Sequence, residues 1–397
     1  MYIGKKIWAV LWPVVILFGI SFSSSAQLVS GEKFGKGINF ISQDSSFTSK
    51  IGFRFQTLFT AEPTLNNSKI DGLETNMLIR RTRLKFDGYA FNPNVVYKVE
   101  LALSNRDFGT PITENGLTPN LVLDAVLKYR FHNNFTLWLG QTKLPSNRER
   151  VISSQKLQQV DRSLLNKYFT LDRDIGVQLR HKATLGNNFL VENIFSISNG
   201  EGRNLTKGNF GGLDYTYRLE LLPFGKFAGK GDYVGGAVEL EDKHKLAIGF
   251  TYDYNESTPR SAGQLGSFIL DSLGNYVNAN IQSTFIDWMY KYKRFSFMGE
   301  LAQKSSTVAD DNAFYESKFF SGSGINQSVG YMFTDKWEVS GRYTYVDRTH
   351  STNLTMYTLG FSKYIVKHNL KFQTDFSLTD EEGEIEPLIR FQCEMAF

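Results

Sequence analysis

Apolar and polar residues alternate along most of this chain, and they do so most clearly at its C-terminal end. Every second residue from Ile389 to Phe397 is apolar, and the residues between them include Arg390, Gln392 and Glu394. Side chains of a β-strand point to opposite faces with a period of two. The pattern therefore predicts a terminal strand with one apolar wall and one charged wall, which ends on an aromatic residue.

Sixteen segments with this alternation follow one another along the chain. They are residues 51–59, 78–86, 95–103, 121–131, 135–139, 175–179, 189–197, 213–221, 246–254, 284–292, 295–301, 325–333, 337–345, 355–361, 370–376 and 389–397. In residues 246–254, for example, Phe250 falls on the apolar parity and Thr251 on the polar one. An even number of antiparallel strands is what a closed bacterial membrane barrel requires.

The connections between these segments differ in length in a regular way. Links after even-numbered segments are mostly tight turns, at residues 92–94, 132–134, 186–188, 292–294, 334–336 and 367–369. Links after odd-numbered segments are mostly long. Residues 223–245 are an exception, because this long link follows an even-numbered segment. Transmembrane barrels have short periplasmic turns and long external loops, whereas a soluble β-sandwich gives no reason for this alternation. The sequence therefore predicts an all-β fold, a 16-stranded antiparallel transmembrane β-barrel with both termini in the periplasm.

The N-terminal residues have the features of an export signal. Lys5 and Lys6 precede an apolar run over residues 7–20, and Ser24-Ser25-Ala26 provides the small-x-small site before cleavage. A transmembrane anchor is the alternative, but the run is short for a membrane span. We expect three parts: a signal peptide at residues 1–26, a short periplasmic segment at 27–46 and the barrel at 47–397.

Composition fits a barrel and excludes several other classes. The chain is 41% hydrophobic and 14% aromatic, with 33 Phe, 19 Tyr and 5 Trp, and its net charge is only +4. That charge is too weak to indicate nucleic-acid binding. The single cysteine, Cys393, excludes intramolecular disulfides and cysteine-based metal sites. No G-x-S-x-G motif, Gly-rich phosphate loop or His cluster is present. We therefore expect no enzyme, no cofactor and no metal.

The third external link, residues 145–172, is long enough to fold into the barrel. Its residues Leu157, Val160 and Leu164 have helical spacing. A barrel of about sixteen strands leaves a wide aqueous lumen, so a selective channel needs a constriction. Cations that would then lie in or near the pore are Arg148, Arg150, Lys156, Arg162 and Lys167. The alternative is a solvated surface loop whose charges keep it soluble.

Several short motifs occur in the order and spacing of a known family. They are Gly52-Phe-Arg54-Phe-Gln56, Arg80-Arg81-Thr-Arg83-Leu-Lys-Phe-Asp-Gly88, Asp124-Ala125, Gly140-Gln141-Thr-Lys143-Leu-Pro145, Asp161-Arg162-Ser-Leu164, Arg173-Asp174-Ile-Gly176-Val-Gln178-Leu179 and Arg390-Phe-Gln392. With these motifs the chain resembles the phosphate-selective porin O and P family over most of its mature length. The resemblance implies a sixteen-stranded porin, usually trimeric, in the lipid of the Gram-negative outer membrane. It also implies small anions such as phosphate as permeants.

The C-terminal residue carries a further expectation. A last strand that ends in Phe resembles the closing strand of outer-membrane barrels. We therefore expect Phe397 to act as a signal to the barrel-assembly machinery.

A basic wall along the first strands is the candidate path for anions. Arg81, Arg83 and Lys85 share one face of the second strand. Further cations on the polar parity of neighbouring strands are Arg54, Lys98, Lys128 and Arg130. Guanidinium groups bind phosphate oxygens in a forked geometry and stay charged at any relevant pH.

Two alternatives to an anion channel stay open. Carboxylates on the same parity, such as Asp87, Glu100 and Asp124, would pair with these cations across neighbouring strands and cancel any selectivity. The predicted function is passive diffusion of small hydrophilic solutes, with a preference for anions or phosphate. The alternative function is a non-conducting adhesive or structural barrel, for which residues 223–245 and the external loops would provide the partner surface.

Overall fold

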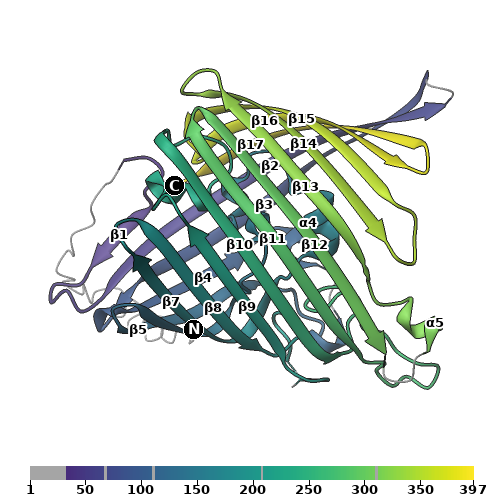
Figure 1. The fold of residues 1–397 in the computed structure, drawn as a ribbon, viewed down its shortest axis with the longest axis horizontal. Coiled ribbons are helices and arrows are strands. Elements are labelled where there is room, and N and C mark those ends of the chain that lie inside the picture. Colours follow the sequence, from purple (N-terminus) through teal and green to yellow (C-terminus); the bar gives the residue numbers. More distant parts are fainter. Residues whose placement is uncertain (1–32, 67–68, 110–111, 207–208, 309–311) are drawn as a thin grey trace, which may run out of the picture.

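A single antiparallel sheet closes on itself to form a barrel (Figure 1). The computed structural model describes residues 33–66, 69–109, 112–206, 209–308 and 312–397. Strand β17 pairs with strand β2 over the register from Ile389↔Ala61 to Ala396↔Arg54, and this pairing closes the ring. Strands β2 to β17 thus form the sixteen-stranded antiparallel barrel that the alternating pattern predicts.

The strands follow one another around the wall in chain order. Their bounds are β2 Thr48–Asn66, β3 Lys69–Ala90, β4 Asn92–Ala102, β5 Val122–His132, β6 Phe135–Lys143, β7 Arg173–Leu185, β8 Phe189–Ser198, β9 Asp214–Leu222, β10 Glu241–Thr258, β11 Ala279–Lys293, β12 Phe295–Val308, β13 Gly322–Met332, β14 Trp337–Arg348, β15 Leu354–Val366, β16 Leu370–Glu381 and β17 Glu384–Ala396. Each of the sixteen predicted segments overlaps one of these strands. The real strands are mostly longer, because backbone pairing continues beyond the residues whose side chains show the alternation.

The two faces of the barrel wall have the expected chemistry. Phe250 is half-exposed on the outer face, while its neighbour Thr251 is buried inside and donates a hydrogen bond from Oγ1 to the Pro145 carbonyl oxygen. Other large apolar side chains that remain exposed on the outside include Leu359 and Phe376. An apolar outer band is what lipid contact requires.

Helices are few and short. Their bounds are α2 Asn105–Phe108, α3 Arg148–Val151, α4 Leu164–Phe169 and α5 Ala313–Glu316, with 3-10 turns η1 Thr113–Asn115, η2 Ser154–Lys156 and η3 Ala228–Tyr233. Within the described ranges, none of the helices is long and apolar enough to cross a membrane. The helix expected from the spacing of Leu157, Val160 and Leu164 was wrong: the chain bends through residues 158–161, and α4 begins only at Leu164.

The N-terminal part contributes one further strand. The short strand β1, Ile38–Ile41, lies in the segment expected to be periplasmic and pairs with the start of β2. The predicted signal peptide and residues 27–32 lie outside the described residues. Most long connections and α5 lie at one end of the barrel, on the right of Figure 1, and the C-terminus lies at the other. The β2–β3 hairpin projects beyond the rest of the wall at the end with the long loops (Figure 1).

Phe397 completes the seam between the two ends of the sheet. Its backbone N–H and carbonyl each form a 2.9 Å hydrogen bond with the backbone of Phe53, and the two rings lie 5.5 Å apart. Deleting Phe397 removes both bonds and the aromatic contact. We predict that the deletion variant fails to reach the outer membrane, as measured by surface labelling and fractionation, while Phe397→Tyr assembles normally. Wild-type surface levels of the deletion variant would show that this residue is no assembly signal.

Candidate functional site

The connection between β6 and β7, residues 144–172, contacts the inner wall on several sides. The side-chain amide of Asn147 donates to Glu300 Oε1 on β12 at 3.0 Å. The Val160 N–H donates to Asp375 Oδ2 on β16 at 3.2 Å, and Arg54 Nη2 on β2 donates to Ser154 Oγ at 2.7 Å. Because these three strands belong to different parts of the ring, the segment crosses the interior. We call residues 144–172 the inner loop.

A buried ion network fastens the start of the inner loop. Arg148 is fully buried and pairs with Glu220 on β9 and with Asp287 on β11, where Nε lies 3.1 Å from Oδ1. Arg218 completes the network, with its Nη1 at 2.7 Å from Asp287 Oδ2. Arg148 therefore anchors the loop to the wall and is not free to meet a solute.

The long link after β9 also enters the barrel. The Gly235 N–H donates a 2.7 Å hydrogen bond to the Lys156 carbonyl of the inner loop. Phe227 belongs to the same buried apolar cluster as Ile152 and Leu157. We call residues 223–240 the periplasmic link. The link and the inner loop together occupy one side of the interior.

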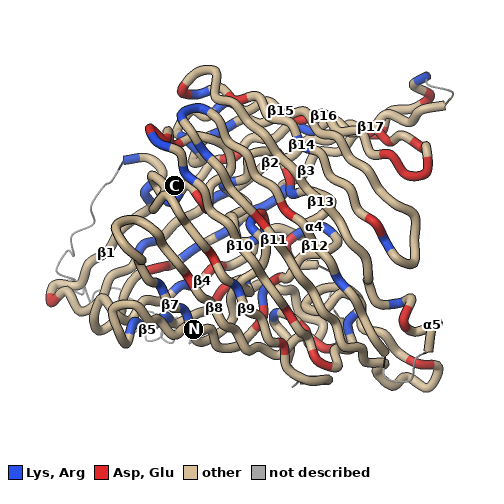
Figure 2. The backbone as a smooth tube through the Cα atoms, in the orientation of Figure 1, with Lys and Arg blue, Asp and Glu red and all other residues tan. Residues whose placement is uncertain are grey.

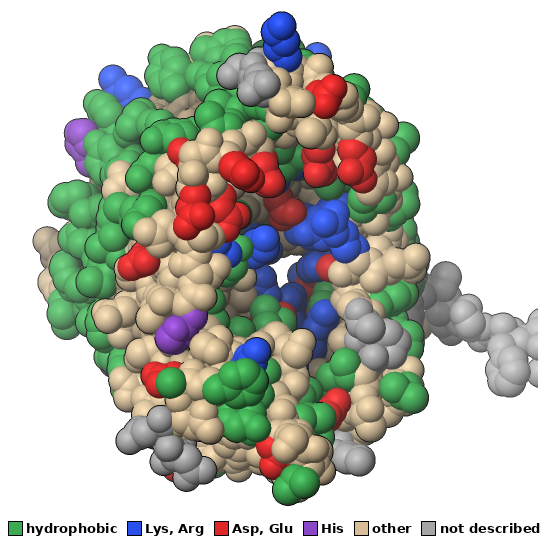
Figure 3. Space-filling view, turned by 90° about the vertical axis from the view of Figure 1, so that its right-hand side faces the viewer, with side chains coloured by type: hydrophobic (Ala, Val, Ile, Leu, Met, Phe, Trp, Pro, Cys, Tyr) green, Lys and Arg blue, Asp and Glu red, His purple; other side chains and the backbone are tan. Residues whose placement is uncertain are grey.

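An open cavity of about 1350 Å³ remains beside them. It is lined mainly by the inner faces of β3 to β9, by the inner loop and by the periplasmic link. Eighteen Lys and Arg and nine Asp and Glu line it, whereas the whole chain has 44 and 40. The cavity is thus strongly biased toward positive charge. In the view of the end with the long loops, Lys and Arg lie within the opening and Asp and Glu gather on its rim (Figure 3). The backbone view shows Lys and Arg, together with Asp and Glu, along the strands of the barrel wall (Figure 2).

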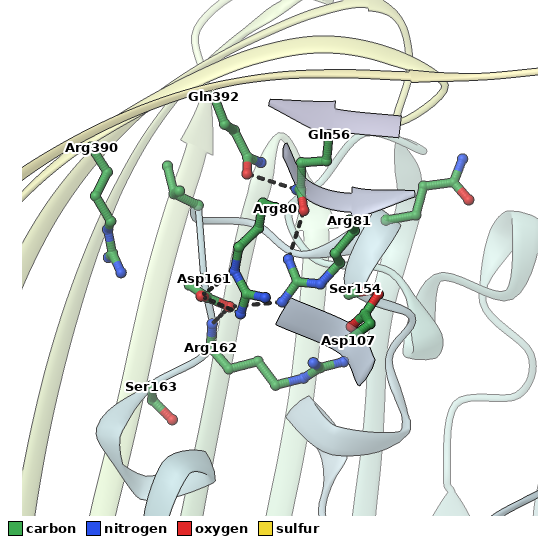
Figure 4. A network of polar contacts seen from close by, with 12 residues as sticks. Gln56, Arg80, Arg81, Asp107, Ser154, Asp161, Arg162, Ser163, Arg390 and Gln392 are labelled. Carbon is green, nitrogen blue, oxygen red and sulfur yellow. Dashed lines mark hydrogen bonds and ion pairs between the residues drawn. The ribbon is translucent and has the colours of Figure 1, made fainter. Parts of the chain in front are cut away.

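Two adjacent arginines of β3 meet one carboxylate of the inner loop (Figure 4). Arg80 Nη2 lies 2.9 Å and Arg81 Nη2 lies 3.1 Å from the oxygens of Asp161. Gln56 of β2 accepts a second hydrogen bond from Arg81 and donates one to Gln392 of β17. Two guanidinium groups share one carboxylate, so the cluster keeps a net positive charge.

A β-bulge makes this pairing possible. The register between β2 and β3 passes from Gln56↔Arg81 to Thr57↔Ile79, which leaves Arg80 as the extra residue. A bulge locally changes the direction in which side chains point. Adjacent residues of a regular strand would face opposite sides, whereas here both reach Asp161.

Asp161 stays ionised in this cluster. Burial alone would raise the pKa of its carboxyl, but the guanidinium groups of Arg81 and Arg80 hold that pKa well below its usual value. The Asp161 carboxylate therefore stays charged across the neutral pH range.

Nearer the periplasmic end, a tryptophan separates two cations. Lys128 Nζ lies 3.8 Å and Arg180 Cζ lies 3.7 Å from ring centroids of Trp138 on β6. Cation–π contacts of this kind are favourable without a carboxylate. Among the described residues, no carboxylate lies within 4.0 Å of Lys128 Nζ, and the Trp138 ring is its close partner.

Seven of the twelve cations predicted to line the pore do line the cavity. They are Arg81, Arg83, Lys98, Lys128, Arg150, Arg162 and Lys167. The five that lie elsewhere are Arg54, Lys85, Arg130, Arg148 and Lys156. Arg54 pairs with Glu394 at 2.9 Å, and Arg130 is exposed beside Asn94 near the start of β4.

Several cations of the basic wall are paired with carboxylates, as the alternative interpretation expected. Arg83 lies 3.1 Å from both Glu100 and Asp107. Lys98 lies 2.7 Å from Asp124, and Lys85 lies 2.7 Å from Asp87. Pairing is therefore extensive on β3 and β4, but the cavity as a whole keeps its excess of cations.

Several other lining cations were not among those predicted to line the pore. They are Arg80, Arg106, Lys143, Arg173, Arg180, Lys182, Arg203, Arg218, Lys226, Lys230 and Arg390. Arg80 had a usable signal, since an arginine on the lipid-facing parity costs about 2–4 kcal/mol near the membrane midplane. Such a position indicates a bulge or an interruption of the strand.

A closed antiparallel barrel with an apolar outer face and a charged, open interior is the architecture of Gram-negative outer-membrane porins, and this chain has that fold. The model of the phosphate-selective porin O and P family matches residues 50–226, which confirms the resemblance over that part of the chain. The match covers less than half of the chain, and the rest of the barrel shares the porin fold without it. No curated protein sequence matches this chain.

Solved structures of outer-membrane proteins share the fold at low sequence identity. An OmpT loop L8 deletion mutant from Vibrio cholerae is 12% identical with a TM-score of 0.58, over 89% of this chain and 100% of that one. In-vitro folded OmpT of the same organism, in its trimer form, is 12% identical with a TM-score of 0.54, over 89% and 100%. An anion-selective porin from Comamonas acidovorans is 9% identical with a TM-score of 0.58, over 88% and 100%.

Proposed function

We propose that this porin forms a water-filled channel for passive diffusion of small hydrophilic solutes and that it prefers anions, including phosphate. The observation that carries the proposal is the lining of the cavity, where Lys and Arg outnumber Asp and Glu two to one. In a narrow lumen with low-dielectric walls, such an excess lowers the energy of an anion and raises that of a cation.

The cluster of Arg80, Arg81 and Asp161 supports a path of weak sites. Each guanidinium already donates to Asp161, so an anion competes with a carboxylate for these groups. Conduction requires sites that attract an ion without holding it. Arginines shared with a carboxylate meet that requirement better than free arginines, which would bind phosphate in a forked geometry.

The proposed partners are those expected of an outer-membrane porin. We propose a homotrimer in outer-membrane lipid, delivered there by the barrel-assembly machinery through the strand that ends at Phe397. The trimer form of an outer-membrane protein with the same fold and the aromatic seam between Phe397 and Phe53 support this. The phosphate-selective name of the matching family supports phosphate among the permeants.

Two measurements on purified protein test the function. Stable open steps in planar bilayers are expected, because a non-conducting adhesive barrel gives none. In liposome swelling, a sugar acid is expected to enter faster than an amino sugar of the same size, with the neutral sugar between them. The absence of open steps would overturn the proposed channel function. Equal entry of the two charged sugars would overturn the proposed anion preference.

A further inference from the structure

The periplasmic link differs from every other described turn at its end of the barrel. Short turns join β7 to β8 at residues 186–188 and β13 to β14 at residues 333–336, whereas the link runs inward from Leu222 to Glu241. Its residues Val234, Gly235 and Ala237 are buried. A turn that merely connects two strands would stay at the rim and in water. The inward course calls for a specific role.

The barrel wall fixes the backbone of this link at two adjacent residues. Lys291 Nζ on β11 donates a 2.8 Å hydrogen bond to the Val234 carbonyl oxygen. His368, in the turn between β15 and β16, has Nε2 at 3.1 Å from the Gly235 carbonyl oxygen. Lys291 is itself fully buried and does not line the cavity. Residues 234 and 235 are therefore held at a defined place inside the barrel.

At this fixed place the link meets the inner loop, backbone against backbone. The Gly235 N–H donates to the Lys156 carbonyl at 2.7 Å. A Cβ atom at position 235 would lie 2.5 Å from the Gln158 nitrogen and 2.8 Å from the Lys156 oxygen. Gly235 is not among the glycines with positive φ, so its backbone conformation is open to other residues. Close approach alone requires a glycine here.

An apolar contact adds to the backbone contact. Phe227 is buried with Ile152 and Leu157 of the inner loop and with Met289 and Met298 of the wall. Burying a phenylalanine contributes about 1.5–3 kcal/mol. The periplasmic link thus contacts residues 152–158 of the inner loop, only a few residues before Asp161.

We propose that the periplasmic link is a positioning element for the inner loop, and that it thereby sets the width and the charge selectivity of the channel. Its contacts with residues 156–158 fix this part of the inner loop, and they thereby keep Asp161 opposite Arg80 and Arg81. The part of the inference that concerns selectivity rests on the proposed anion preference. The part that concerns width does not.

Two variants loosen the link without changing a residue of the inner loop or of the cavity lining. Gly235→Val forces the link away from Lys156, and Lys291→Met removes the bond to Val234. Ala228→Val is the control, because Ala228 lies in the same link with an exposed side chain that does not line the cavity. Folded trimer on unheated gels and circular dichroism establish assembly before each recording.

Larger open steps, more open-channel noise and a partial loss of anion preference are expected for Gly235→Val and Lys291→Met, with wild-type behaviour for Ala228→Val. If Gly235→Val does not assemble, Lys291→Met decides alone. Wild-type conductance and noise in the assembled variants would overturn the proposal. The conductance comparison holds even if the wild-type channel lacks anion preference, so failure of the proposed function is distinguishable from failure of this inference.

A double-mutant cycle separates positioning from simple obstruction. Residues that act through one network give non-additive effects on the measured quantity. Combining Gly235→Val with neutralised Arg80 and Arg81 is expected to change the permeability ratio by less than the sum of the separate effects. Additive effects would mean that the link only obstructs the lumen, and would overturn its action through the inner loop.

Discussion

Replacing Arg148 by methionine is expected to destabilise the folded barrel by roughly 3 kcal/mol, because breaking a buried ion pair leaves an uncompensated buried charge. Arg148 is fully buried, and without it Arg218 alone faces both Glu220 and Asp287. Unfolding of the assembled protein in guanidinium chloride measures the loss. The inner loop is also expected to become sensitive to protease, since Arg148 anchors its first turn.

The control for this prediction removes one charge of each sign. Arg148→Met combined with Glu220→Gln leaves Arg218 paired with Asp287, whose oxygens lie 2.7 and 3.0 Å from its nitrogens. Replacing both partners of a buried pair costs much less than removing one. The double variant should therefore recover most of the lost stability. Wild-type stability of the single Arg148→Met variant would contradict the anchoring role.

Neutralising Arg80 and Arg81 together, each to glutamine, is expected to shift the permeability ratio toward cations about fourfold. A unit charge some 8 Å from the path of an ion contributes about 0.5 kcal/mol in water, with opposite sign for an anion and a cation. Screening at about 0.1 M salt reduces each contribution by roughly half, which leaves roughly twofold in the permeability ratio for each charge. In addition, Asp161 loses both of its described guanidinium partners and then repels anions. Bi-ionic potentials in planar bilayers measure the ratio.

The matched control removes the same two charges from positions off the cavity. Arg130 lies near the end of β5 and bonds to Asn94, and Arg294 lies between β11 and β12 and bonds to Asp335. Neutralising this second pair should leave the permeability ratio close to that of the wild type. An equal shift in the two double variants would show that selectivity follows net charge and does not depend on the Arg80–Arg81–Asp161 cluster.

The barrel wall was predictable because one physical rule governs every strand. Lipid outside and water or polar loops inside impose a period of two, so residues such as Phe250 and Thr251 show their facing in the sequence. The alternation of turn and loop length then gave the topology. Helical structure in the inner loop was less predictable, since the spacing of Leu157 to Leu164 comes from contacts with the wall and not from a helix.

The site was predictable only where a strand supplies it directly. Arg81 and Arg83 were found because they lie on the polar parity of β3, but Arg80 reaches the same carboxylate through a bulge that parity cannot show. Arg148 was expected near the solute and is instead a buried anchor, because its neighbours Glu220 and Asp287 come from distant strands. Contacts between segments far apart in the sequence leave no local pattern.

The excess of Lys and Arg around the cavity is expected to make the wild-type channel selective for anions. The most direct test is its zero-current potential across a potassium chloride gradient, a salt whose two ions have nearly equal mobility in water. We expect this potential to lie on the side of the chloride equilibrium potential, and to move further toward it at low ionic strength, where charges are screened less. A potential near zero, or one on the potassium side, would contradict this expectation.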